Sequence, residues 1–177
     1  MGAFTSCTSL ASITLPKGLT TIDVEAFLAC TSLESITLPE GLISLGRGAF
    51  RSCTSLVSIV IPNRITTLQS DTFSGCSSLT TVTLPESITE LQAAFPYCSS
   101  LSALYCKATM PPKLSSATFN LQELAANFKI YVPASDDDSI INAYRTAQYW
   151  SDFSDRIEEE IPSGGGEDTG DGEESDW

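Results

Sequence analysis

The 177-residue sequence contains no histidine, and this absence excludes several kinds of chemistry. Histidine is the usual base beside a nucleophilic serine or cysteine, and it is the commonest metal ligand. The six cysteines include no Cys-x-x-Cys pair for zinc or redox chemistry. The acids Glu34, Glu40 and Glu86 stand singly, without the partner that a glycosidase-like pair needs. We therefore expect no catalytic residue, no metal site and no cofactor, and we expect that the protein is not an enzyme.

Basic residues are also scarce, since nine Lys and Arg face 22 Asp and Glu. The bases are scattered, and the formal net charge of −13 repels phosphate backbones, so we expect no nucleic-acid partner. No apolar run approaches the roughly 18 residues that span a bilayer, so membrane insertion is not expected. Residues 158–177 hold nine of the acids and no base. Because residues 162–177 are mainly Gly, Ser, Asp and Glu, they are expected to form a disordered acidic, Gly-rich tail.

One short pattern, Ala-Phe-x-x-Cys, returns every 23 residues through the first half of the chain. Its copies begin at Ala3, Ala26, Ala49, Thr72 and, one residue early, Ala94. Such a period is typical of a solenoid, in which a unit buries its apolar side only by stacking on its neighbours. Residues 1–133 are therefore expected to form one solenoid domain.

Each unit continues with a stretch in which apolar and polar residues alternate until a proline, as in Ile36-Thr37-Leu38-Pro39. Alternation with β-branched residues predicts a short strand that the proline ends. Equivalent stretches lie at 13–16, 59–62, 82–85, 104–106 and 130–133, and of these only 104–106 lacks the proline. Stacking in register then predicts a parallel sheet of six strands on one side of the solenoid.

After Pro133 the pattern becomes helical. The apolar residues Ile140, Ile141, Tyr144, Ala147 and Trp150 follow an acidic run, with Ser135 expected as the N-cap. The run 136–138 suits the positive end of a helix and lacks the spacing of a calcium loop. Together with Phe153 and Ile157, residues 134–161 are expected to form a helical cap over the last coil, whose edge would otherwise be open.

The cysteines of the repeated pattern occupy one position in successive coils. Neighbouring α-carbons would then lie about 5 Å apart, a distance that alone permits a disulfide. In-register side chains run parallel, however, which keeps their β-carbons too far apart for a bond. We therefore expect free cysteines that act as small buried apolar residues.

The residues that point outward from the six predicted strands form two columns, which we call the strand face. One column is Ser12, Ser35, Ser58, Thr81, Ala103 and Lys129, and the other is Thr14, Thr37, Val60, Thr83, Tyr105 and Tyr131. Neighbouring tyrosines supply the amphipathic area that is enriched at binding hot spots, so the strand face is the candidate binding site. The alternative is that both tyrosines only cover the final coils. Val60 interrupts the threonine column that an ice-binding surface would need.

The repeat, written A-F-x-x-C-x-S-L-x-S-I-x-L-P, resembles the BspA-type (Treponema-like) leucine-rich repeat family over about residues 3 to 106. The segment Ile130-Tyr131-Val132-Pro133, with Tyr144 and Trp150 beyond it, is similar to a C-terminal segment of members from host-associated anaerobic bacteria. The resemblance implies an α/β-type repeat solenoid: a right-handed stack of about six coils with a parallel sheet on one face and a short C-terminal helical cap.

Members of that family are typically secreted or surface-exposed and are associated with adhesion and protein binding. The resemblance therefore implies a non-enzymatic binding module, extracellular or at a bacterial cell surface, whose partner is a host or bacterial surface protein or glycan. The alternative is a structural spacer or stalk that carries an upstream domain. Met1-Gly2 leads directly into a repeat without a polar capping unit, so we expect that an upstream portion precedes this sequence.

Overall fold

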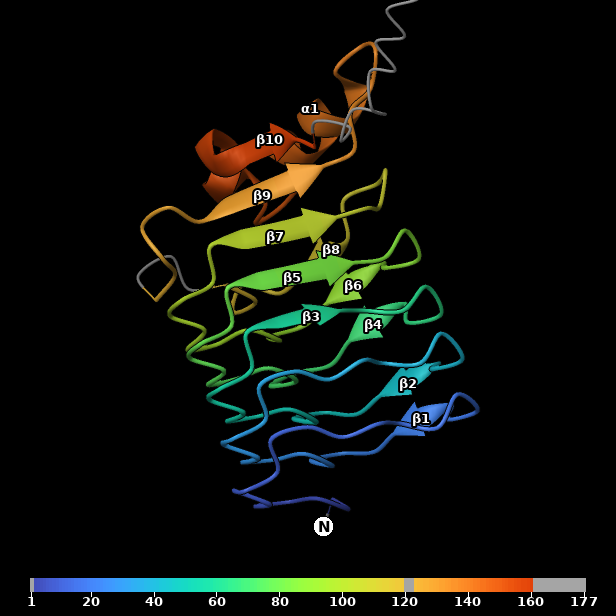
Figure 1. Ribbon diagram of the computed structural model, residues 1–177. Helices are drawn as coiled ribbons and strands as arrows, with labels where there is room; N and C mark the ends of the chain where they lie inside the picture. The colour runs from blue at the N-terminus through green and yellow to red at the C-terminus, as the bar shows by residue number, and fades with distance from the viewer. Residues whose placement is uncertain (1, 120–122, 161–177) are drawn as a thin grey trace, which may run out of the picture.

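The computed structural model describes residues 2–119 and 123–160, which wind into a stack of coils (Figure 1). Its strands form sheets in the orders β10-β9-β7-β5-β3, β4-β6-β8 and β1-β2, and all the pairings are parallel. Each coil contributes one repeat, so that residues 23 positions apart lie side by side along the stack, as Thr21 and Ser44 do. The expected repeat solenoid is confirmed.

The strand face is built on four of the predicted strands, namely β3 (Ser58–Val60), β5 (Thr81–Leu84), β7 (Ala103–Cys106) and β9 (Lys129–Val132). The predicted alternation is present, since Val82, Leu104 and Ile130 are buried while their neighbours in sequence face outward. The prediction was wrong for 13–16 and 36–39, which are not strands. No backbone hydrogen bond joins residues 35–38 to the coil on either side, and a strand requires that ladder.

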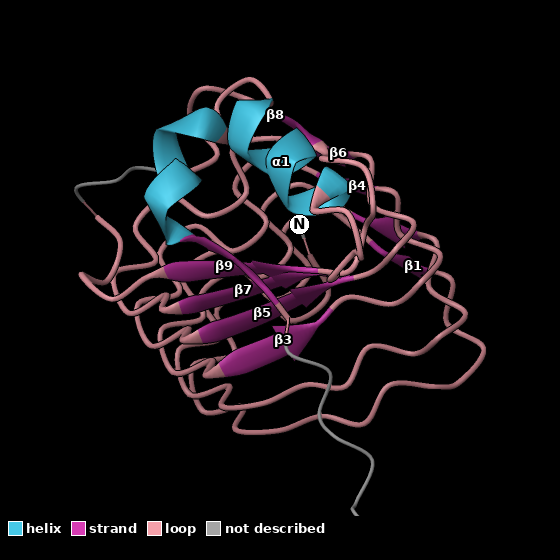
Figure 2. Cartoon of the chain, turned by 90° about the horizontal axis from the view of Figure 1, so that it is seen from above, coloured by secondary structure: helices cyan, strands magenta, loops and turns pink. Residues whose placement is uncertain are grey.

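A second row of strands lies on another side of the solenoid, as the view along the stack shows (Figure 2). It comprises β1 (Thr21–Ile22), β2 (Ser44–Leu45), β4 (Thr67–Leu68), β6 (Glu90–Leu91) and β8 (Lys113–Leu114). Each of these strands has two residues, and its second residue is buried. Each strand of this row precedes the turn that carries the repeated phenylalanine, and its buried residue contributes to the core.

The core contains a continuous stack of phenylalanine rings that runs through six coils. Successive centroids lie 5.1–5.7 Å apart and successive ring planes are within 6° of parallel. The rings are those of Phe4, Phe27, Phe50, Phe73, Phe95 and Phe119. Phe95 keeps its place in the stack although Pro96 follows it, so this proline does not disrupt the stacked rings.

Backbone hydrogen bonds on the phenylalanine side all point in one direction along the stack. The amide of Phe27 donates to Ala49 O at 2.8 Å, and the amide of Phe50 donates to Thr72 O at 2.9 Å. The next coils repeat this pattern, and at the C-terminal end the amide of Tyr97 donates instead to the Glu123 carboxylate at 3.0 Å. Within the described residues, the backbone N–H groups that join two coils on this side therefore point toward the C-terminal end.

The C-terminal cap consists of α1 (Ser139–Thr146), a 3₁₀ helix η1 (Ser151–Arg156) and the strand β10 (Ile157–Glu159). Of the apolar residues predicted to cover the last coil, Ile140 and Ala147 are partly buried and the others, including Tyr144, Trp150 and Phe153, are buried. The helical description was incomplete, because β10 extends the sheet in parallel with β9. The cap thus closes both the core and the sheet edge of β9.

The predicted N-cap was wrong. Helix α1 begins at Ser139, and the N-cap position is Asp138, whose φ of 55° is left-handed and whose side chain makes no capping bond. Ser135 instead accepts a hydrogen bond from the Ile140 amide at 3.3 Å, because the acidic run forms a turn before the helix starts. The tail predicted at residues 162–177 lies outside the described residues.

Candidate binding face

The five-stranded sheet brings eight of the twelve strand-face residues onto one surface. Its register aligns Val60, Thr83, Tyr105 and Tyr131 in one column. The neighbouring column aligns Ser58, Thr81, Ala103 and Lys129. The remaining four predicted residues, Ser12, Thr14, Ser35 and Thr37, are exposed but belong to the first two coils, outside the sheet. The structure therefore assembles the C-terminal part of the strand face on a rigid sheet and leaves its N-terminal part without one.

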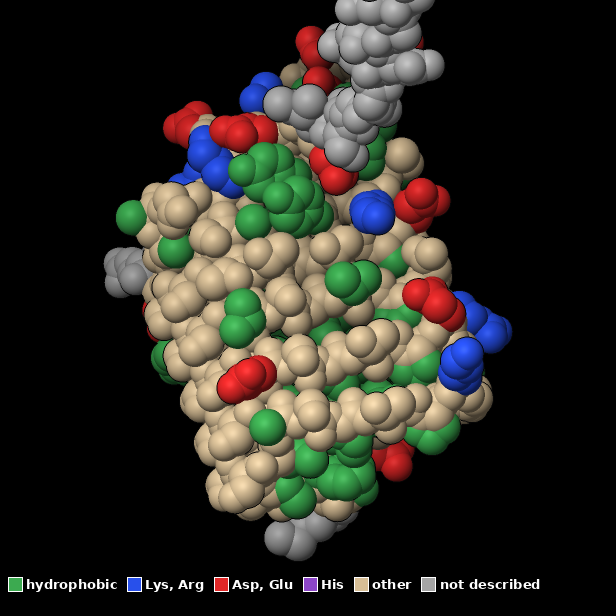
Figure 3. Space-filling view, viewed as in Figure 1, with side chains coloured by type: hydrophobic (Ala, Val, Ile, Leu, Met, Phe, Trp, Pro, Cys, Tyr) green, Lys and Arg blue, Asp and Glu red, His purple; other side chains and the backbone are tan. Residues whose placement is uncertain are grey.

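Tyr105 and Tyr131 form a stacked pair on this surface, with centroids 4.8 Å apart and ring planes 16° from parallel. Both are half-buried, whereas the residues beneath them, Leu104 and Ile130, are fully buried in the core. An apolar patch on this side of the molecule, over β7 and β9, is visible in Figure 3. The C-terminal end of the core is closed by other aromatic residues, among them Trp150 and Phe153. The tyrosine pair is therefore not needed to cover the core.

An ion pair borders the tyrosines on the cap side. Lys129 Nζ lies 2.6 Å from Glu158 Oε1, and the register places Glu158 opposite Tyr131. Both side chains are partly exposed, so solvent screens the pair and it contributes at most about 1 kcal/mol to stability. Glu158 was missed from the sequence because β10 was not predicted. The result is an aromatic patch with a charged rim.

Two adjoining depressions lie on the N-terminal side of the tyrosines. We number the coils by their stacked phenylalanines, so that Phe27 belongs to coil two and Phe50 to coil three. The first depression, of about 270 Å³, opens between coils two and three and is lined by Ser35, Thr37, Ser58 and Val60, among others. The second, of about 170 Å³, is lined by residues that include Glu40, Asn63, Thr83 and Lys107. Glu40, Val60 and Pro62 line both depressions. Sequence reasoning missed Asn63 and Lys107 because they follow the strands singly and belong to no repeated pattern.

A larger hollow, of about 480 Å³, is lined by Phe4, Ile13, Leu15 and Leu19 and other residues of the first two coils. It is the apolar interior of the first coil seen from the end of the stack. Its lining is mainly apolar, and Asp23 is the one charged residue that the structure describes there. Because the hollow is the inner side of a coil and not part of the strand face, we do not take it as the candidate site.

The repeated cysteines have a structural role. The thiols of Cys30, Cys53, Cys76 and Cys98 each donate to a phenylalanine carbonyl of the preceding coil, at 3.1–3.2 Å. Burial raises the pKa of the Cys53 and Cys98 thiols to about 12, so they stay protonated at neutral pH. The prediction of free buried cysteines is confirmed for these four and for Cys106.

The prediction was wrong for Cys7, which is free but exposed. In the described chain no coil covers the outer side of the first coil, and its cysteine therefore lacks the carbonyl and the packing that the others have. The sixth cysteine has its own partner: Cys106 Sγ lies 3.1 Å from the Tyr144 hydroxyl, which donates to Ala108 O at 2.7 Å. Burial raises the pKa of the Cys106 thiol to about 11.

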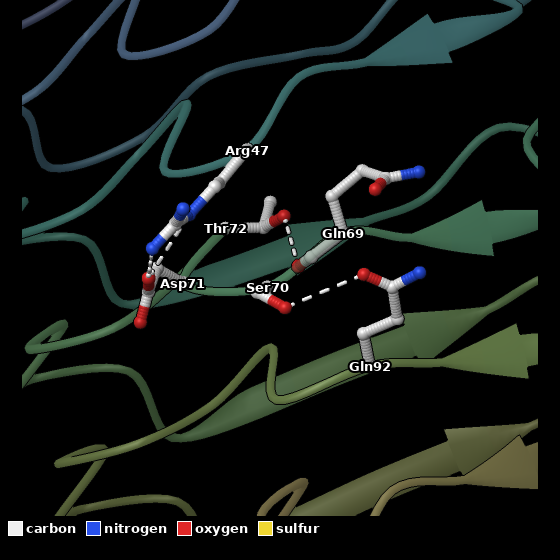
Figure 4. A network of polar contacts seen from close by, with 6 residues as sticks. All are labelled: Arg47, Gln69, Ser70, Asp71, Thr72 and Gln92. Atoms are coloured by element: carbon white, nitrogen blue, oxygen red, sulfur yellow. Dashed lines mark hydrogen bonds and ion pairs between the residues drawn. The ribbon is translucent and has the colours of Figure 1, made fainter.

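Polar side chains at one corner of the solenoid connect successive coils (Figure 4). Arg47 donates to Asp71 Oδ2 at 3.0 and 3.4 Å, and Ser70 donates to Gln92 Oε1 at 3.3 Å. Thr72, which replaces the usual alanine, is fully buried, and its hydroxyl donates to Gln69 O at 2.7 Å. The Arg47–Asp71 and Ser70–Gln92 bonds join residues of successive coils, so this corner stabilises coil stacking.

Within residues 2–119 and 123–160, no three acidic or cysteine side chains converge on a point where a metal ion could bind. In the same part of the chain, no helix has the length and apolar character required to cross a membrane.

Comparisons with known proteins fit this architecture. A comparison with curated proteins finds no match. Among solved structures, a leucine-rich cell surface protein of Faecalibacterium prausnitzii is 30% identical with a TM-score of 0.62, over 75% of this chain and 34% of its own. A leucine-rich repeat protein of T. pallidum is 36% identical with a TM-score of 0.54, over 58% of this chain and 49% of its own. The chain therefore spans between a third and a half of the length of these two proteins.

The family model for the BspA type leucine-rich repeat region matches residues 1–124 in six copies. The sixth copy agrees with the sixth ring of the phenylalanine stack, which the sequence pattern alone did not reveal. On the combined evidence of the repeats, the coil geometry and this match, the chain belongs to the BspA-type leucine-rich repeat family.

Proposed function

We propose that this chain is a non-enzymatic binding module that recognises a protein or glycan through its strand face. Leucine-rich repeat solenoids present extended surfaces on rigid parallel coils, and such surfaces suit interaction rather than catalysis. The observation that carries the proposal is the stacked pair Tyr105 and Tyr131, which stands on the sheet outside the core and outside the cap.

The surroundings of the pair have the composition of a binding site. Interfaces commonly place aromatic anchors at the centre and polar or charged groups at the rim. Here the anchors are the two tyrosines, and the rim is the Lys129–Glu158 ion pair on one side and the Ser and Thr columns on the other. The side chains of these columns are small and none of them projects past the tyrosines' own strands, so a large partner has access to the tyrosine pair.

We extend the proposal to location: the module acts at a bacterial cell surface, facing a host or bacterial surface component. Its support is the family membership and the likeness to the F. prausnitzii protein, which is described as a cell surface protein. Adhesion is the role in which a rigid, non-enzymatic binding face of this kind would serve such a surface.

The test is binding of the labelled chain to arrays of host matrix proteins and glycans, compared with the double variant Tyr105→Ala/Tyr131→Ala. We expect the double variant to lose binding while its melting temperature stays nearly unchanged, because the pair lies outside the core. Tyr97→Ala is the matched control, since Tyr97 is 64% exposed but lies off the strand face. A large drop in melting temperature would instead make the tyrosines structural. No ligand on either array would contradict the proposal and indicate a spacer.

A further inference from the structure

The ladder of backbone hydrogen bonds is interrupted on the strand face between coils two and three. The amide of Val57 donates to Glu34 O at 3.2 Å, and the next bond between these coils joins the Gly48 amide to Ser70 O at 3.2 Å. Residues 35–38 and the side of β3 that faces them make no such bond to each other. The 270 Å³ depression opens at this interruption. Backbone donors and acceptors on both of its sides therefore lack partners among the described residues, although such groups are normally paired.

The second depression continues the first and adds charged and amide side chains. Glu40, Asn63 and Lys107 line it, and neither Glu40 nor Lys107 belongs to an ion pair within the described residues. The three side chains supply a carboxylate acceptor, an amide that both donates and accepts, and an ammonium donor. Their opposite charges leave the depression without a net charge.

An aromatic ring stands at the C-terminal end of the two depressions. Tyr131 covers one face of the Tyr105 ring, at a centroid distance of 4.8 Å. On the other side, the register places Thr83, whose side chain is too small to cover a phenol ring and which itself lines the second depression. Tyr105 therefore has one face open toward the depressions, and this face can pack against an apolar ring surface.

From this arrangement we infer that the two depressions and the open face of Tyr105 form a binding groove for a neutral oligosaccharide of pyranose rings. This inference rests on the proposed function, whose ligand class it narrows. A sugar offers many hydroxyls that both donate and accept, which matches unpaired backbone groups beside Ser, Thr, Glu, Asn and Lys side chains. Its ring also has an apolar face that an open tyrosine face can cover. At a coil spacing of about 4.8 Å, the column from Thr37 through Val60 and Thr83 to Tyr105 is about three pyranose rings long.

Charge selects a neutral sugar over an acidic one. The groove carries one acid and one base, and the chain as a whole has a formal charge of −13. Sulfated or carboxylated glycans would be repelled at long range without an excess of local positive charge to hold them. A protein partner would need a broader surface than depressions of 270 and 170 Å³ provide.

The experiment applies the labelled chain to an array of neutral trisaccharides, built of hexoses or N-acetylhexosamines, beside sialylated and sulfated glycans. The best neutral trisaccharide is then titrated calorimetrically against three pairs of variants. Val60→Arg places a long side chain between the depressions, and Val57→Arg is its control, because Val57 is also exposed (48% against 64%) but lines neither depression. We expect Val60→Arg to weaken binding at least about tenfold and Val57→Arg to leave it unchanged.

The second pair is Glu40→Gln with Glu86→Gln as the control. Both glutamates follow a Leu-Pro pair at the same repeat position and are exposed, but only Glu40 lines the groove. We expect Glu40→Gln to weaken binding about tenfold, because a hydrogen bond to a charged group contributes that much, and Glu86→Gln to have no effect. The third pair, Tyr105→Ala with Tyr97→Ala as the control, tests the open face of Tyr105. We expect only Tyr105→Ala to weaken binding.

Three results would overturn the inference. They are the absence of neutral trisaccharide binding at millimolar concentration, binding of acidic glycans alone, and equal affinities for Val60→Arg and Val57→Arg. The proposed function would survive if a protein still bound the chain and lost binding in the double tyrosine variant. If that protein were also blocked by Val60→Arg, the groove would be a protein site and the sugar assignment would be refuted.

Discussion

Replacing Phe50 by alanine tests the packing on which the whole solenoid depends. Phe50 is fully buried, and its ring lies 5.2 Å from that of Phe27 and 5.6 Å from that of Phe73. Removing the ring loses about 2 kcal/mol of burial free energy. It also leaves a cavity that the neighbouring coils can fill only in part, at about 24 cal/mol per Å³, so that roughly 80 Å³ costs about 2 kcal/mol more. We expect the free energy of unfolding to fall by about 4 kcal/mol.

Urea denaturation followed by circular dichroism measures this change, with the slope of the transition recorded beside its midpoint. The matched control is Phe4→Ala, at the end of the same stack. Phe4 contacts one ring instead of two and is only partly buried, so its replacement should cost less than half as much. Equal effects of the two substitutions, or a loss of less than about 1 kcal/mol for Phe50→Ala, would refute the stacked core.

Three further predictions concern single residues. Ala29 has a φ of 58°, which strains a residue with a β-carbon. Ala29→Gly should therefore raise the free energy of unfolding by about 0.5–1 kcal/mol in the same urea assay. A fall in the free energy of unfolding would refute the strain. The pKa of the Cys53 thiol is raised from about 9 to about 12 in the folded protein, because burial favours the neutral thiol. The resulting stabilisation is complete below pH 9 and is lost as the pH rises toward 12, by about 1.4 kcal/mol per pH unit. Cys53→Ala should therefore flatten the fall of stability measured between pH 9 and 11, and an unchanged slope would contradict the shift. Tyr144→Phe leaves Ala108 O without its donor in a buried site and should lower the free energy of unfolding by about 1–3 kcal/mol by thermal or urea unfolding, whereas a neutral result would mean that water replaces the hydroxyl.

The features that could be predicted from the sequence are those in which one signal repeats. Phenylalanine, cysteine and the alternating stretch before the proline recur with one period, and together they located the core and the strands from Ser58 to Val132. Phe119 escaped because its copy has threonine in place of alanine and no cysteine after it. Strands of two residues, such as β1 and β2, are too short for any alternation to be visible.

The candidate site could be predicted only where the alternation of side chains along a strand determines which residues point outward. That rule placed Tyr105 and Tyr131 together on the outer surface, as the structure does. It could not find the groove, because the interrupted ladder between coils two and three depends on small differences in how whole coils stack. Nor could it assign a role to Glu40, whose counterpart Glu86 also follows Thr-Leu-Pro but lines neither of the two depressions.

The uniform direction of the amides on the phenylalanine side makes the two rims of the stack chemically unlike. The carbonyl of Ala3, the counterpart of Ala26, accepts no bond from the described residues, so the first described coil presents an acceptor on this line. At the other end of the line the Tyr97 amide donates to the Glu123 carboxylate, so a charged side chain takes up that donor. Coils can bond on this side only when the amides of one face the carbonyls of the next, so bond polarity favours stacking in one direction and disfavours contact between two carbonyl rims.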